Sequence, residues 1–113
     1  MNEEPGIDLS PGVVAERMKE DLLLVDVREP YEWRAGHVPG SVHIEMSAIG
    51  ERLDELPADR PTAFICRSGA RSAMVARTLR ARGYDAYNVD GGFLDWFDAS
   101  LPTEPENAEV ASH

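Results

Sequence analysis

One short run of the sequence combines a nucleophile, two cations and several small residues: Cys66, Arg67, Ser68, Gly69, Ala70, Arg71 and Ser72. The small residues allow a tight turn, in which several backbone N–H groups point toward one centre. The free N–H groups at the start of a following helix add to the same centre, and together they favour the thiolate form of a cysteine. The run therefore predicts an anion-binding loop with a reactive sulfur at its base.

Charge is distributed unevenly along the chain, and its positive part surrounds Cys66. The net charge is −10, yet residues 60–84 contain six of the eleven basic residues and no acidic residue. The other five basic residues share the rest of the chain with all 21 acidic residues. The overall charge disfavours a nucleic acid or an anionic membrane as partner, whereas the local positive charge favours a small anionic substrate.

The simplest alternative is that Cys66 is a small buried side chain at the end of a strand, which is the commoner role of a free cysteine. The strand-end position, the glycine in the loop and the two flanking arginines together favour the reactive role. Because the chain has no second cysteine, it cannot form an intramolecular disulfide or a two-cysteine redox pair. Neither a metal nor a cofactor is expected.

Strands and helices are expected to alternate along the chain. Apolar runs, turn residues and helix caps predict strands at 22–27, 62–66 and 84–90, a brief extended piece at 42–44, and helices at 11–21, 30–36, 47–56, 72–82 and 93–99. This alternation is typical of an α/β fold, with a central parallel sheet covered by helices on both faces. Ligands of such sheets bind beyond the carboxyl ends of the strands, where Asp26 and Cys66 are both expected to lie.

The length of 113 residues fits a single domain. Residues 1–6 are expected to form a flexible leader, residues 7–101 the folded domain, and residues 102–113, which are polar and contain proline and glutamate, a disordered tail. The first twelve residues are acidic and lack an apolar stretch, so no signal peptide is expected. A chain with one unpaired cysteine suits a reducing compartment, and the cytoplasm is the expected location.

Four segments in order carry a resemblance to the rhodanese homology domain: DVREPYEW at 26–33, GHVPGS at 36–41, CRSGARS at 66–72, and GGF at 91–93 with Trp96 behind it. The resemblance covers about residues 7–101. It implies a three-layer α/β fold with a central parallel sheet. It also implies a sulfurtransferase, in which Cys66 takes a sulfane sulfur from a donor such as thiosulfate, holds it as a persulfide and passes it to cyanide, a thiol or a protein.

The length of the loop separates this chemistry from that of related enzymes. Phosphatases and arsenate reductases of related fold place five residues between the cysteine and the arginine, which makes room for a tetrahedral oxyanion. Here only four residues separate Cys66 from Arg71, and this spacing favours sulfur transfer over phosphoryl transfer. A phosphatase, an arsenate reductase and a docking or redox-sensing module without catalysis remain the alternatives.

Several other positions are expected to support the loop. Arg67 and Arg71 are predicted to bind the anionic donor, with Arg71 also bracing the loop. Asp26 and Arg28 end the neighbouring strand, and Arg28 is expected to pair with a carboxylate such as Glu32 rather than to face the substrate. The remaining predictions concern two further positions: His37 is interpreted as structural rather than as a general base, and Gly91-Gly92 as a turn beside the loop.

Overall fold

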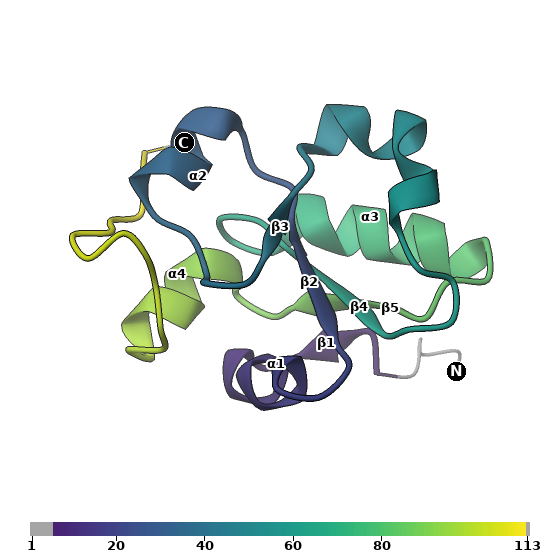
Figure 1. Cartoon of the computed structure of the whole chain (residues 1–113), viewed down its shortest axis with the longest axis horizontal. Helices are drawn as coiled ribbons and strands as arrows, with labels where there is room; N and C mark the ends of the chain where they lie inside the picture. Colours follow the sequence, from purple (N-terminus) through teal and green to yellow (C-terminus); the bar gives the residue numbers. More distant parts are fainter. Residues whose placement is uncertain (1–5, 113) are drawn as a thin grey trace.

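The computed structural model describes residues 6–112, which are built around one five-stranded parallel sheet (Figure 1). The strands are β1 (Asp8–Leu9), β2 (Leu23–Asp26), β3 (Val42–His43), β4 (Thr62–Ile65) and β5 (Ala86–Val89). Their order across the sheet is β1-β5-β4-β2-β3, and every neighbouring pair is parallel. Because β4 is the central strand, Cys66 leaves the sheet at the middle of its carboxyl edge.

Helices cover both faces of the sheet, as the sequence predicts. The α-helices are α1 (Pro11–Met18), α2 (Pro30–Ala35), α3 (Ala70–Ala81) and α4 (Gly92–Asp98). One apolar core joins α1 and α4 to the sheet, and a second core joins α3 and the segment before β4 to the opposite face. The three-layer α/β architecture is therefore confirmed, with α2 placed near the carboxyl edge beside the C-terminal segment (Figure 1).

The central strand β4 is buried on both of its faces. Phe64 belongs to the core under α3, while Ala63 and Ile65 belong to the core under α1 and α4. All four residues of the strand are buried, which is why its sequence is a continuous apolar run rather than an alternating one. This burial fixes the base from which the loop after Ile65 departs.

Two helix starts are built from the side chains that precede them. The Ser10 hydroxyl oxygen accepts a hydrogen bond from the backbone N–H of Val13 at 3.3 Å, with Pro11 in the first turn of α1. Glu29 and Glu32 form a capping box at the start of α2. The first helix ends at Met18, three residues before the predicted end at Asp21.

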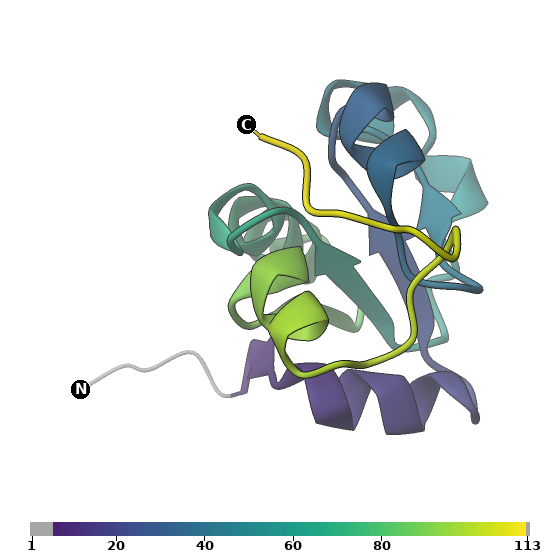
Figure 2. The ribbon, with the colours of Figure 1, turned by 90° about the vertical axis from the view of Figure 1, so that its left-hand side faces the viewer.

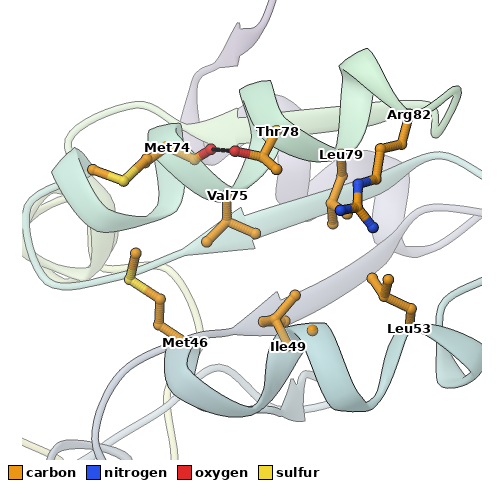
Figure 3. A pocket seen from close by; sticks show the side chains of 9 residues that line it. Met46, Ile49, Leu53, Met74, Val75, Thr78, Leu79 and Arg82 are labelled. Carbon is orange, nitrogen blue, oxygen red and sulfur yellow. Dashed lines mark hydrogen bonds between the residues drawn. The ribbon is translucent and has the colours of Figure 1, made fainter.

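The segment predicted as one helix over 47–56 consists of two short 3-10 helices, Met46–Glu51 and Leu53–Glu55. Gly50 lowers the propensity for a continuous α-helix, and the ion pair between Arg52 and Glu55 has the i, i+3 spacing of the tighter helix. Figure 3 shows Met46, Ile49 and Leu53 of this segment facing α3 across an apolar groove. This groove does not include Cys66, so it is separate from the predicted site.

Residues 102–112 follow the surface of the domain, which differs from the expectation of a disordered tail (Figure 2). Glu104 and His37 exchange two backbone hydrogen bonds of 2.8 and 2.9 Å, and the N–H of Glu109 donates to the carbonyl of Ala35 at 2.9 Å. Val110 packs against the core of α1 and α4. Polar composition alone misses these contacts, because the backbone makes most of them and one apolar residue supplies the packing.

Strand β1 is absent from the predicted elements because two residues are too few to show an apolar period. Asp8 and Leu9 pair with Asn88 and Val89 of β5 and so extend the sheet by one strand. Among residues 6–112, no helix combines the length and the apolar character that crossing a membrane requires.

Candidate active site

The sulfur of Cys66 lies at the centre of converging hydrogen-bond donors. The backbone N–H groups of Gly69 and Ser72 lie 3.1 and 3.4 Å from Sγ, and the Ser72 hydroxyl oxygen lies 3.3 Å from it. Cys66 itself is buried, with 1% of its surface exposed. Two backbone N–H groups of the loop therefore point at the sulfur, and donors in this arrangement stabilise negative charge.

The tight turn of the loop depends on Gly69. This residue has φ of 104° and precedes the first turn of α3, so its backbone occupies a region that disfavours side chains. The twelve-residue helix α3 then points its N-terminal end at the same sulfur through the N–H of Ser72. Helix N-termini carry partial positive charge, which adds to the effect of the individual donors.

The start of α4 holds the loop from the other side. The N–H of Phe93 donates to the Cys66 carbonyl at 2.8 Å, and the N–H of Leu94 donates to the Arg67 carbonyl at 3.0 Å. Gly91 and Gly92 both have positive φ, which brings these N–H groups against the loop. The carbonyls of Cys66 and Arg67 thus point toward α4, while the N–H groups of Gly69 and Ser72 face the sulfur.

A substitution at Gly92 tests how closely the start of α4 packs against the loop. A Cβ atom on Gly92 would lie 2.6 Å from the carbonyl oxygens of Cys66 and Arg67, whereas a Cβ on Gly83, which also has positive φ, meets nothing within 4 Å. We expect Gly83→Ala to lower the free energy of unfolding by about 1 kcal/mol through backbone strain alone. Gly92→Ala should cost about 2 kcal/mol more, because the loop must move. Urea unfolding measures both, and equal losses would contradict the close packing.

The two loop arginines have different settings. The Arg71 guanidinium donates to both carboxylate oxygens of Glu32, at 3.1 and 3.2 Å, and Glu32 is fully buried. Burial alone would raise the pKa of Glu32, but hydrogen bonds from Arg71 and the Glu29 N–H, with the charges of Arg71 and Arg28, lower it. Burial alone would likewise lower the pKa of Arg71, and Glu32 and the nearby Cys66 raise it. Arg71 therefore stays charged beside the loop.

Arg67 turns toward the C-terminal segment. Its Nε–H donates to the carbonyl oxygen of Ala111 at 3.1 Å, and the residue is partly buried. Both arginines are expected to bind the donor, and Arg71 is also expected to brace the loop. In the structure Arg71 forms an ion pair with Glu32, and Arg67 contacts residues that follow the predicted domain.

Asp26 and Arg28 form a buried ion pair after β2. Arg28 Nε and Nη2 donate to the Asp26 carboxylate at 2.9 and 2.7 Å, and both side chains are fully inaccessible to solvent. Arg28 also donates to the Gly36 carbonyl at 2.7 Å and lies over the Phe93 ring, 4.4 Å from its centroid. The expected partner Glu32 was the wrong carboxylate, because the nearer Asp26 takes this guanidinium and Arg71 takes Glu32.

Two histidines, His37 and His43, stack against Trp33 of α2. The His37 ring stacks on Trp33 at 3.7 Å, and its two nitrogens meet the Trp33 carbonyl and the Glu104 carboxylate. The Nε2 of His43 lies 2.7 Å from the Arg28 carbonyl. These contacts place both rings in the packing around α2.

Asn88 contacts the loop although it is not among the residues predicted from the sequence. It is buried in β5, and its side chain joins Ser72 of the loop to Asp8 of β1. A buried amide within an apolar strand was the available signal, because such a group requires polar partners. Within residues 6–112, no three side chains of the metal-binding types lie close enough to hold an ion.

These features define an α/β domain with a cysteine at the base of a tight loop, at the carboxyl edge of its sheet. Residues 10–99 match the family model of the rhodanese-like domain. The chain belongs to the rhodanese-like domain family, as its sequence motifs predict.

Curated relatives and solved structures agree with this assignment. The chain is 38% identical over 97 residues to a putative sulfurtransferase, YtwF, of Bacillus subtilis, covering 84% of this chain and 94% of that protein. It is 36% identical to the thiosulfate sulfurtransferase GlpE of Pseudomonas putida, covering 78% and 80% of the two chains. The crystal structure of a rhodanese-related protein from Thermoplasma volcanium superposes with a TM-score of 0.81 at 30% identity, over 86% and 96% of the two chains.

Proposed function

We propose that this protein is a sulfurtransferase that carries sulfur as a persulfide on Cys66, with thiosulfate as a donor. The observation that carries the proposal is the convergence of the Gly69 and Ser72 N–H groups on the sulfur, with the Ser72 hydroxyl oxygen beside it. Such donors stabilise the anionic thiolate that attacks the sulfur donor. The relatives named as sulfurtransferases support the same reaction class.

The reaction has two half-steps. The Cys66 thiolate attacks the outer sulfur of thiosulfate, a new S–S bond forms, and the old S–S bond breaks with its electron pair leaving on sulfite. Cyanide or a thiolate then attacks the terminal sulfur of the persulfide, and the Cys66 thiolate is released. Sulfite and the sulfur-bearing acceptor leave as products, and both half-steps balance without a further reactant.

The charges around the loop suit a small anionic donor. Arg71 is held beside the sulfur by Glu32, so it supplies positive charge without closing over the site. Arg67 is the more adaptable cation, since a single hydrogen bond to Ala111 holds it. We propose that Arg67 releases Ala111 and binds the donor. We also propose that the protein lies in the cytoplasm, a reducing compartment in which Cys66 stays a thiol.

Mass spectrometry of the protein after incubation with thiosulfate tests this function. We expect a gain of one sulfur atom on Cys66, and cyanide should remove it with release of thiocyanate. A parallel assay with an aryl phosphate separates the phosphatase alternative. An unchanged mass together with phosphate release would contradict the proposal, and an unchanged mass without phosphate release would favour a non-catalytic module.

A further inference from the structure

A chain of polar side chains leads from the surface to the reactive sulfur. Asp8 and Asn88 are register partners on β1 and β5, and the Asn88 Nδ2 donates to the Asp8 carboxylate at 2.9 Å. The Asn88 Oδ1 accepts a hydrogen bond from the Ser72 hydroxyl. The same hydroxyl oxygen lies 3.3 Å from the Cys66 sulfur. Asp8 is exposed, whereas the other three residues are buried.

The direction of each hydrogen bond follows from the chemistry of Asp8. An ionised carboxylate only accepts, so Asn88 must turn its NH2 group toward Asp8 and its oxygen toward Ser72. The Ser72 hydroxyl has one hydrogen, and the Asn88 oxygen takes it. Ser72 therefore presents a lone pair to Cys66, which a thiol S–H can meet as donor but a thiolate cannot.

We propose that Asn88, oriented by Asp8, is a positioning residue that draws the Ser72 hydroxyl hydrogen away from Cys66 and so favours the thiol in the resting protein. When the sulfur becomes anionic, the hydroxyl must turn toward it and give up its bond to Asn88. The two backbone N–H groups of the loop are unaffected, because neither depends on this orientation. The inference rests on the proposed function in one respect, namely that the Cys66 thiolate is the nucleophile in sulfur transfer.

Removal of Asp8 frees the amide of Asn88 to rotate. The NH2 group can then donate to Ser72, and the Ser72 hydroxyl can donate to the sulfur. We expect Asp8→Ala to shift the pH profile of Cys66 alkylation by iodoacetamide to lower pH, with a rate about fivefold higher below the midpoint. Because Asp8 is exposed, this variant should retain the fold.

Asp8→Ala also removes a negative charge, which could itself change the reactivity of Cys66. Repeating it in a Ser72→Ala protein separates that charge effect from the effect of the Asp8–Asn88–Ser72 hydrogen bonds. Without the hydroxyl, Asp8→Ala should leave the alkylation profile nearly unchanged, while a direct charge effect would persist. The other charged groups around the loop are the same in each pair of variants: Asp26, Arg28, Glu32, Arg67, Arg71 and Asp95.

Three results would overturn the proposal. These are an equal shift with and without the Ser72→Ala substitution, no shift in either background, and a shift to higher pH. Alkylation needs no sulfur donor, so the experiment gives its answer even if thiosulfate fails to modify Cys66. The experiment therefore distinguishes failure of the proposed role of Asn88 from failure of the proposed function.

Discussion

Cys66→Ser is expected to lower the rate of sulfur transfer from thiosulfate to cyanide by about a thousandfold or more. The serine hydroxyl is a far weaker nucleophile at neutral pH, and it cannot hold a transferable sulfur as a persulfide does. The donors that converge on Sγ can bind the serine oxygen, so the fold should persist. A thiocyanate assay measures the loss, and circular dichroism checks the fold.

Cys66→Ala provides the control for that design. Alanine removes the acceptor altogether and leaves the buried N–H groups of Gly69 and Ser72 without a partner on that side, so this variant should unfold at lower urea than Cys66→Ser. Both variants should be equally inactive. Residual transfer above about a tenth of the original rate in either one would rule out a persulfide on Cys66 as the carrier.

Arg28→Ala is expected to lower the free energy of unfolding by about 3–5 kcal/mol, because it leaves the Asp26 carboxylate buried without its partner. The substitution also removes the hydrogen bond to Gly36 and the contact with the Phe93 ring. Since the backbone of Phe93 holds the Cys66 carbonyl, sulfur transfer should fall as well. Urea unfolding, followed by tryptophan fluorescence, measures the stability change.

Arg52→Ala is a matched comparison for this substitution. The Arg52–Glu55 pair has the same 2.7 Å separation as the Arg28–Asp26 pair, but its side chains are 40% and 46% exposed. Water and salt screen such a pair, so the unfolding midpoint should change little. Similar losses in the two variants would contradict the assignment of the Arg28 effect to burial.

The sequence contains enough information to predict the layers of the fold and the tight turn that follows Cys66. Continuous apolar runs mark β2 and β4, and the small residues after Cys66 mark the turn into α3. These features are local, because each depends on neighbours within a few positions. The three-layer architecture and this turn follow from them.

The contacts that differ from expectation join residues far apart in the chain. Arg28 selects Asp26, while Glu32 meets Arg71 from α3, and composition does not distinguish among nearby carboxylates. The C-terminal segment is held mainly through backbone groups of 35–37, which leave no mark on its own side chains. The Asn88 link is visible only once β1 and β5 are known to be register partners.

The two outermost strands of the sheet, β1 and β3, contain two residues each. An open sheet edge can pair with a strand of another molecule, and a longer row of unpaired N–H and C=O groups makes this pairing stronger. The four-residue strands β2, β4 and β5 all lie between these two short edge strands. Within residues 6–112, edge-to-edge self-association, the first step toward β-aggregation, thus has a template of two residues on either side of the sheet.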